Sequence, residues 1–171
     1  MDAEAAADSA NDSWIGVQRV KTGSTVFLDF DGCLNHRKHV ATGGYPKMPF
    51  APECIERLNR LIASTDAKVV ISSTWRFGKT IEELQELLAS HGAVCHVVGV
   101  TPTHVERTLV QAYTRGQGIT FYLTDHPTTT YVVLDDDDDM EGHEAHFVRT
   151  SMETGLTDAN VEEAAAILRR Y

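Results

Sequence analysis

Two pairs of carboxylates are the residues of this sequence best suited to chemistry. Asp29 and Asp31 occur in VFLDFDGCLN, directly after an apolar run, and Asp135 and Asp136 follow the apolar run YVVL at 131–134. Unpaired charge at the edge of a protein core is unfavourable, so these acids need either a compensating cation or a chemical role. Carboxylate oxygens suit Mg²⁺, which commonly binds a few carboxylates together with water and phosphate.

The chemistry that fits clustered carboxylates and a divalent metal is phosphoryl transfer. Four carboxylates at one edge of a sheet would repel one another unless a cation neutralised them. A bound metal also screens the negative charge of a phosphate, which lets an anionic carboxylate approach phosphorus. One aspartate would attack, while a second would protonate the leaving oxygen and later activate water. Hydroxyl groups and a cationic side chain would hold the phosphate oxygens.

Segments on either side of the acids predict alternating strands and helices. Apolar, β-branched runs predict strands at 26–30, 68–72, 94–98 and 131–134, and a short strand at 146–149. Helical spacing of apolar residues predicts helices at 52–63, 80–91 and 157–170, with less regular ones at 105–109 and 116–123. Residues 33–51, with two prolines and a Gly-Gly pair, predict a long loop. This alternation predicts an α/β fold, a three-layer α/β/α sandwich around a mostly parallel, Rossmann-like sheet.

The candidate site residues all fall where predicted strands end. In open parallel sheets, ligands bind at the carboxyl ends of the strands. The residues at these ends are Asp29 and Asp31, Ser72 and Ser73, and Asp135 and Asp136. Residues i and i+2 of an extended chain point the same way, so Asp29 and Asp31 can share a site while Phe30 packs into the core.

Length and composition indicate one ordinary folded domain. The chain has 171 residues, of which 42% are hydrophobic and 23% are charged. No apolar run approaches the roughly 20 residues that span a bilayer, and the first residues do not resemble a signal peptide. Three cysteines without a pairing pattern suit a reducing compartment, so we expect a cytoplasmic protein. We expect residues 1–22 to be disordered or loosely attached and residues 23–171 to form the domain.

The net charge of −10 bears on the partners of the protein. Proteins that grip long stretches of nucleic acid need basic surfaces, so we expect no extended duplex and no membrane as partner. Seven of the acids lie within residues 135–144, however, where a bound cation would reduce the working charge. A phosphorylated small molecule or a nucleic acid end remains compatible with this charge.

Three segments resemble sequence signatures of the haloacid dehalogenase (HAD) superfamily. VFLDFDGCLN resembles the first signature, KVVISSTW the second and YVVLDDDDD the fourth, in the expected order. The combination of ISSTWR, GVTP, RGxxI and VVLDDDxDM is similar to the small HAD-type phosphatase domains of polynucleotide kinase-phosphatases and RNA-repair proteins. The resemblance covers residues 26–157 and implies a HAD-like sheet.

The resemblance implies roles for the four acids. Asp29 corresponds to the nucleophile and Asp31 to the general acid and base. Mg²⁺ would be held by Asp29, by the backbone carbonyl of Asp31, and by one or both of Asp135 and Asp136. Solvated loop acids are the alternative reading for the rest of the run, at 137–139.

Phosphate-binding residues follow from the same resemblance. Ser72 and Ser73 would bind the phosphate, and Arg115 in YTRGQGI stands where the third signature begins. Other cations that could take this role are Arg76, Lys79 and Arg107. Neither usual insertion point of the family holds a domain-sized segment, so we expect no large cap domain and an open site whose only lid is the loop at 33–51.

These residues favour a Mg²⁺-dependent phosphomonoester hydrolase that acts through an aspartyl-phosphate. The leading substrate class, from the resemblance, is a nucleotide or a polynucleotide terminal phosphate. A phosphatase of small metabolites or mononucleotides is one alternative, and a non-catalytic HAD-like module that binds phosphate or a partner is another. Intact acids argue against the latter. We interpret the histidine pairs at 36–39 and 143–146 as surface residues rather than zinc ligands, and Trp75 as a packing residue.

Overall fold

The computed structural model describes residues 23–43, 46–102 and 113–170. The predicted N-terminal tail (1–22) and the predicted helix at 105–109 lie outside these ranges, so both stay predictions. Within them, no helix is long and apolar enough to cross a membrane.

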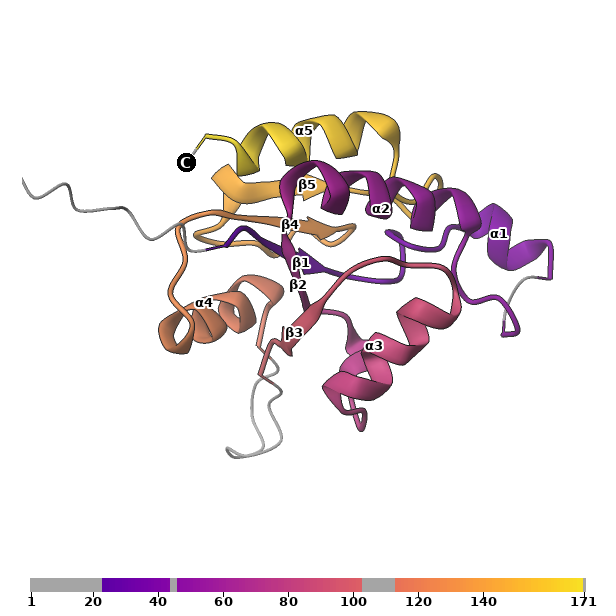
Figure 1. Cartoon of the computed structure of the whole chain (residues 1–171), viewed down its shortest axis with the longest axis horizontal. Coiled ribbons are helices and arrows are strands. Elements are labelled where there is room, and N and C mark those ends of the chain that lie inside the picture. Colours follow the sequence, from indigo (N-terminus) through magenta and orange to yellow (C-terminus); the bar gives the residue numbers. More distant parts are fainter. Residues whose placement is uncertain (1–22, 44–45, 103–112, 171) are drawn as a thin grey trace, which may run out of the picture.

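The described residues form five parallel strands with helices between them (Figure 1). The strands are β1 (Thr25–Leu28), β2 (Lys68–Ile71), β3 (Val97–Val100), β4 (Tyr131–Asp135) and β5 (Phe147–Arg149). The helices are α1 (Arg37–Ala41), α2 (Pro52–Thr65), α3 (Ile81–Ser90), α4 (Arg115–Asp125) and α5 (Asp158–Leu168), with short 3₁₀ helices η1 (Thr74–Arg76) and η3 (Glu144–His146). The strand order is β3-β2-β1-β4-β5, which places β1 at the centre of the sheet with β2 and β4 on either side.

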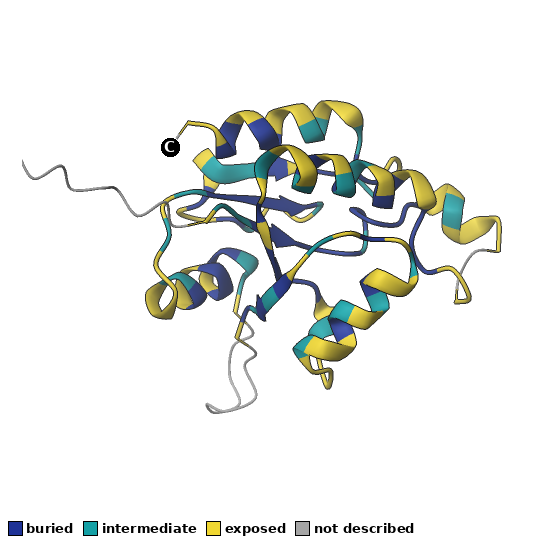
Figure 2. Cartoon of the chain, in the orientation of Figure 1, coloured by how far each residue is buried: buried dark blue, intermediate teal, exposed yellow. Residues whose placement is uncertain are grey.

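Helices cover both faces of this sheet (Figure 1). Val26 and Leu28 of β1 point to one face, where they belong to the same buried cluster as Leu58 of α2 and residues of α3 and α5. Phe27 points to the other face, together with Ile119 of α4. Figure 2 shows the buried residues concentrated in the sheet and on the inner sides of the helices. The predicted three-layer α/β/α sandwich is confirmed.

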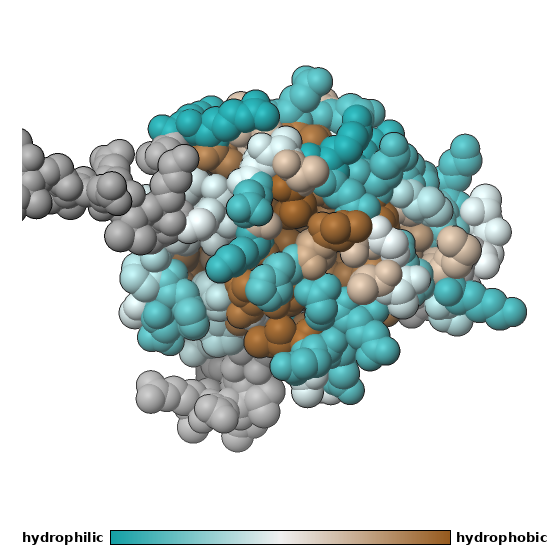
Figure 3. Space-filling view, in the orientation of Figure 1, coloured by the Kyte–Doolittle hydropathy of each residue, from teal (hydrophilic) through white to brown (hydrophobic). Residues whose placement is uncertain are grey.

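The helices are amphipathic, as their sequence spacing predicts. In α2 the buried residues are Cys54, Ile55, Leu58 and Leu61, which repeat at intervals of three and four. Burying one such leucine stabilises the fold by about 1.5–3 kcal/mol. Figure 3 shows hydrophilic groups over the outer sides of the helices and apolar groups gathered between α2 and α3.

Strand β1 is shorter than the predicted strand at 26–30. It ends at Leu28, because the chain turns at Phe30, whose carbonyl accepts hydrogen bonds from the backbone N–H groups of Cys33, Leu34 and Asn35. Phe30 itself is fully buried, as predicted. The turn places Asp29 at the end of the strand and Asp31 within the turn.

The prediction of a strand at 94–98 was wrong by three residues. The strand is Val97–Val100, because the register with β2 pairs Val97 with Val69. Val94 is 74% exposed, and its N–H donates to the side chain of Asn59 (2.7 Å) instead of to a strand. The run at 93–100 is apolar except for His96, and the pairing with β2 selects the part that becomes a strand.

The segment predicted as a long loop contains a short helix, α1. His36 precedes it, and its Nδ1 accepts a hydrogen bond from the His39 N–H (3.4 Å). The Nε2 of His36 contacts Glu53 of α2 (2.9 Å), which ties the start of α1 to the body of the domain. Between β1 and α2 the described residues contain no domain-sized insertion, which agrees with the predicted absence of a large cap.

Candidate active site

Three carboxylates meet at the carboxyl edge of the sheet, where β1 and β4 lie side by side. Asp29 follows β1, and its N–H donates to the Leu134 carbonyl (3.0 Å), which extends the contact between the two strands. Asp135 ends β4 and Asp136 follows it. One side-chain oxygen from each of these three aspartates lies within 4.8 Å of the others. The structure therefore brings together acids that are about 100 residues apart in the sequence.

Burial makes negative charge on these acids unfavourable. Asp29 is 2% exposed and Asp135 is fully buried. Burial raises the pKa of Asp135 to about 8, and the neighbouring charge of Asp29 adds to the rise. Burial also raises the pKa of Asp29, although the charge of Arg115 and a hydrogen bond from Ser73 oppose this shift. A bound cation would stabilise the ionised carboxylates.

The three carboxylates of Asp29, Asp135 and Asp136, called the acid group below, fit a hard divalent cation. Asp29 Oδ1 and Asp135 Oδ2 are buried and have no hydrogen-bond partner among the described residues. A buried polar atom without a partner costs about 1–3 kcal/mol, so a ligand at this position would remove a penalty. All the side-chain atoms that could bind the metal are oxygens, which suits such a cation. Asp136 is only partly buried, so water and substrate can reach the site from its side. Asp29, Asp135 and Asp136 are the side chains that would hold the ion.

Gly32 permits the close approach of the turn after β1 to the acid pair after β4. Its φ of +71° lies in the left-handed region, which favours glycine. A Cβ at this position would lie 2.5 Å from the Cγ of Asp136. The glycine in the DFDG segment is therefore needed both for its backbone conformation and for space beside a candidate metal ligand.

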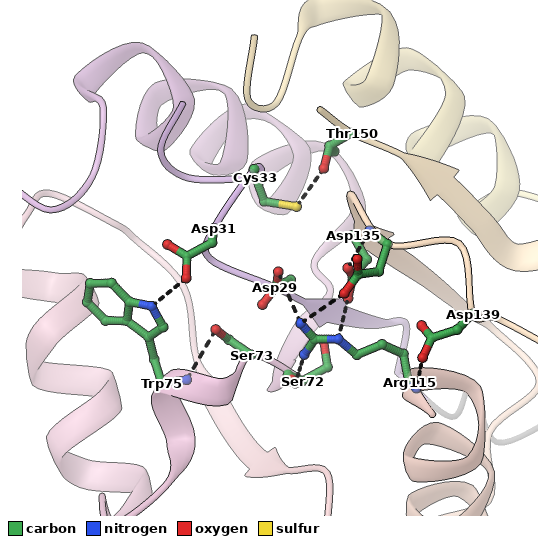
Figure 4. Close-up of polar contacts among 12 residues, drawn as sticks. Asp29, Asp31, Cys33, Ser72, Ser73, Trp75, Arg115, Asp135, Asp139 and Thr150 are labelled. Carbon is green, nitrogen blue, oxygen red and sulfur yellow. Dashed lines mark hydrogen bonds and ion pairs between the residues drawn. The ribbon is translucent and has the colours of Figure 1, made fainter. Parts of the chain in front are cut away.

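Arg115, the first residue of α4, directs its guanidinium at the acid group (Figure 4). Its Nη2 lies 3.5 Å from Asp29 Oδ2, and its Nε lies 3.4 Å from Asp135 Oδ2. Burial works against the charged guanidinium, yet Asp29 and Asp135 raise the pKa of Arg115 overall. Arg115 is thus a fixed positive charge beside the predicted nucleophile.

The backbone around Arg115 is anchored to the end of the acidic run. The Arg115 N–H donates to Asp139 Oδ2 (3.1 Å), and the Gly116 N–H donates to the Asp139 carbonyl (3.0 Å). A Cβ on Gly116 would lie 3.0 Å from backbone atoms of Met140 and Glu141, so only glycine allows this approach. Thr114 caps α4, and Asp139 anchors its first residue, Arg115, while Asp135 and Asp136 belong to the acid group.

Among the described residues, the other candidate cations have different contacts from Arg115. Arg76 uses its donors on backbone carbonyls: Nε bonds that of Thr101 (2.9 Å), and Nη1 bonds those of Ser72 (2.6 Å) and Ser73 (2.7 Å). Burial and the charge of Arg115 lower the pKa of Arg76 to about 10. Lys79 is exposed, and Arg107 lies outside the described residues.

The serines predicted to bind phosphate differ in their contacts. The hydroxyl oxygen of Ser72 is buried and has no hydrogen-bond partner among the described residues. The hydroxyl of Ser73 is engaged, because it bonds the carboxylate of Asp29 and its oxygen accepts the Trp75 N–H (3.3 Å). Ser72 is therefore the serine with a hydroxyl to offer a ligand, and phosphate binding by either residue stays a prediction.

The carboxylate of Asp31 points away from the acid group (Figure 4). Its Oδ1 accepts a hydrogen bond from Asn35 (2.7 Å) and its Oδ2 accepts one from the indole N–H of Trp75 (2.8 Å). Trp75 also packs against Phe30 and Phe50, with ring centroids 5.8 and 5.7 Å away, so the packing role predicted for it is confirmed. Metal binding by the backbone carbonyl of Asp31 stays a prediction.

The sequence reasoning missed Asn35 and Asp139. Asn35 lies four residues after Asp31, at a spacing that lets the turn return its amide to the acid. The signal for Asp139 was weaker, since an acid that anchors the first residue of a helix looks like any other acid of the run until α4 is placed beside it.

One histidine of each pair is buried. The prediction that all four are surface residues was therefore wrong for these two. His36 and His143 are 7% and 5% exposed. His143 contacts the Tyr131 hydroxyl (2.8 Å) and the Gly116 carbonyl (3.0 Å), which explains its burial. Neither pair belongs to a metal-binding group of side chains in the described part of the chain.

Clustered acids at the carboxyl edge of a parallel α/β sheet, beside a partly buried arginine, are the arrangement of a HAD-type domain. A comparison with known protein families agrees: the profile described as "HAD domain in Swiss Army Knife RNA repair proteins" matches residues 25–161. The chain belongs to this family. The comparisons with curated proteins and with solved structures gave no match.

Proposed function

We propose that this protein is a Mg²⁺-dependent phosphomonoester hydrolase that acts through an aspartyl-phosphate on Asp29. Membership of the HAD family supports a phosphatase-type function. The observation that carries the proposal is the group of Asp29, Asp135 and Asp136 with Arg115 beside it, in which Asp29 Oδ1 and Asp135 Oδ2 are buried without a hydrogen-bond partner among the described residues.

In the first step, a carboxylate oxygen of Asp29 attacks phosphorus and the bond from phosphorus to the leaving oxygen breaks. The leaving oxygen keeps the electron pair and takes a proton from the carboxyl group of Asp31, which gives a neutral alcohol. Arg115 stabilises negative charge on the phosphoryl oxygens, and the Ser72 hydroxyl donates to one of them.

In the second step, water attacks the phosphorus of the aspartyl-phosphate and gives its proton to the Asp31 carboxylate. The bond to Asp29 breaks, inorganic phosphate leaves, and both aspartates return to their starting states. Mg²⁺, when bound by Asp29, Asp135 and Asp136, supplies charge neutralisation that lets two anions approach each other.

The substrate class we propose is a phosphorylated nucleic acid end, which follows from the RNA-repair proteins of the family. The absence of a domain-sized insertion between β1 and α2 supports this class, because a large substrate needs an open site. We also propose that the protein works in the cytoplasm. All three cysteines are free thiols, which is typical of a reducing compartment.

The test compares the wild type with Asp29→Asn in a screen of 3′- and 5′-phosphorylated oligonucleotides, free nucleotides and sugar phosphates. We expect the wild type to release phosphate with Mg²⁺, to lose activity in EDTA and to regain it on Mg²⁺ addition. Asp29→Asn should keep its fold by circular dichroism and lose turnover. Appreciable phosphate release by this variant, or activity indifferent to EDTA, would reject the mechanism.

A small-metabolite phosphatase is the second candidate, and the net charge of −10 favours it. The same screen separates the candidates. Preference for free nucleotides or sugar phosphates over matched oligonucleotide ends would replace the nucleic acid class with this one.

A further inference from the structure

Two nitrogen donors from different segments hold the carboxylate of Asp31. Asn35 Nδ2 donates to Oδ1 at 2.7 Å, and Trp75 Nε1 donates to Oδ2 at 2.8 Å. Both distances lie at the short end of the usual range for N–H···O hydrogen bonds. Since each oxygen has its own donor, the plane of the carboxylate is fixed.

Each donor is itself fixed by further contacts. Asn35 is 2% exposed, and its Oδ1 accepts the Gly32 N–H (3.1 Å), which sets the orientation of the amide. The Trp75 ring packs against Phe30 and Phe50. These contacts leave little freedom for either nitrogen to move away from Asp31.

The same network reaches the predicted nucleophile. The backbone N–H of Trp75 donates to the Ser73 hydroxyl, and Ser73 also hydrogen-bonds the carboxylate of Asp29. Trp75, in η1, therefore contacts Asp31 through its indole and reaches Asp29 through Ser73; Figure 4 shows the contacts of Trp75 with Asp31 and Ser73.

We propose that Trp75 and Asn35 are positioning residues that hold Asp31 for proton transfer to the leaving oxygen. This inference rests on the proposed function, in which Asp31 is the general acid. A carboxyl group has about four lone-pair sites, so it can accept both N–H bonds and still carry the proton that it transfers.

The proposal makes a prediction that depends on the leaving group. A sugar alkoxide is a poor leaving group and needs a proton as the ester bond breaks, whereas p-nitrophenolate leaves readily without one. Loss of either donor should therefore slow cleavage of an alkyl phosphate much more than cleavage of p-nitrophenyl phosphate. A role confined to folding would reduce both rates by the same factor.

The experiment measures kcat/KM, which covers the steps up to departure of the alcohol, for Trp75→Phe and for Asn35→Asp. The first variant removes the indole donor, and the second removes the amide donor but keeps the acceptor for the Gly32 N–H. The two substrates are p-nitrophenyl phosphate and the alkyl phosphate that the wild type cleaves best. Leu168→Ala is the control, because it weakens core packing at the end of α5 and removes no donor to Asp31.

For both donor variants we expect the ratio of kcat/KM on the alkyl phosphate to that on the aryl phosphate to fall about ten-fold or more. Leu168→Ala should leave the ratio unchanged. Equal losses on both substrates by Trp75→Phe and Asn35→Asp would overturn the inference while the proposed function stands. If Trp75→Phe shows no cooperative thermal transition, Asn35→Asp alone decides. A wild type without Asp29-dependent turnover would overturn the proposed function, and this inference with it.

Discussion

Arg115 shows how one side chain can serve several acids at once. Its guanidinium lies within 3.5 Å of both Asp29 and Asp135, and it is also 3.8 Å from Asp137. One positive charge does not neutralise this group, so Arg115 reduces the repulsion and leaves a negative site for a metal ion. The same charge is well placed to stabilise a phosphoryl group on Asp29.

Replacement of Arg115 by alanine should lower kcat about 100-fold, because a fixed charge beside the transferring phosphoryl group is lost. Steady-state kinetics at saturating Mg²⁺ measures the effect. Arg37→Ala is a matched control, since Arg37 is exposed and pairs with Glu153 at the surface. Similar losses in both variants would show that Arg115 has no special role.

Gly32 allows a prediction with a close internal control. Gly32→Ala and Gly78→Ala both place alanine at a positive φ, +71° and +70°, so each should lose about 1 kcal/mol of stability. Only the first brings a Cβ against Asp136, since nothing lies within 4 Å of a Cβ at Gly78. We expect Gly32→Ala alone to need much more Mg²⁺ for half-maximal activity. An equal Mg²⁺ requirement in both variants would contradict the role of Gly32 at the site.

At the residue scale, the sequence predicted the acids well because they directly follow apolar strands. Asp29 and Asp135 could be placed at one edge from strand order and the parallel sheet alone. The contacts of Asp139 and Trp75 could not be predicted in this way, because each joins segments that are distant in sequence, whereas the contact of Asn35 with Asp31 is local and depends on the conformation of one turn.

At the scale of the elements, α4 matters because its first turn carries Arg115. Its start is fastened by Asp139 and by His143, which contacts the Gly116 carbonyl and the Thr120 hydroxyl. His143 accepts a hydrogen bond from the Tyr131 hydroxyl on its other ring nitrogen when its Nε2 carries the proton. In the neutral form, both ring nitrogens of His143 therefore have a hydrogen-bond partner.

Low pH should weaken the contacts that His143 makes with α4. Burial lowers the pKa of His143 below its ordinary value of 6.5, so the unfolded chain takes up the proton first. The stability that neutral His143 contributes is present above pH 6.5 and is lost as pH falls through the lowered pKa. The loss is at most about 1.4 kcal/mol for each pH unit. Urea unfolding of wild type and His143→Gln between pH 5 and 8 measures it: the difference in unfolding free energy should shrink toward acid, and a constant difference would refute the linkage.

Helices and strands whose apolar residues recur at a clear period could be predicted from the sequence. Those whose position depends on tertiary contacts could not. β2, β4 and α2 follow their sequence patterns within a few residues. β3 is displaced because its apolar run is longer than the strand, and pairing with β2 chooses the register. α1 is only five residues long, too short for a period, and its start depends on the contact of His36 with Glu53.

At the scale of the whole molecule, the acid group couples metal binding to stability. Mg²⁺ that binds only the folded protein should raise the unfolding free energy, by about 2.7 kcal/mol at 100 times its Kd. Asp135→Asn should no longer respond to Mg²⁺, and at pH values above the raised pKa of Asp135, about 8, it should melt higher than the metal-free wild type because a buried charge is removed. Thermal melts with and without Mg²⁺ measure both effects.

Asp138→Asn provides the control for this experiment. Asp138 belongs to the same acidic run, but it is exposed and pairs with Arg149 (3.4 Å) at the surface. Its replacement should leave the Mg²⁺ response intact. An Asp135→Asn protein that melts lower than the metal-free wild type at pH values above the raised pKa of Asp135, or still gains stability from Mg²⁺, would contradict metal binding at the acid group.

The burial of Asp135 at the end of a central strand has an evolutionary consequence. Selection for a stable fold alone would favour a neutral residue there, while selection for turnover keeps the acid, so the two pressures oppose each other at one position. A descendant that no longer needed to cleave its substrate would gain robustness from its first neutral substitution at this site. We therefore expect decayed copies of the domain to lose this acid early and to be sturdier than their active ancestors.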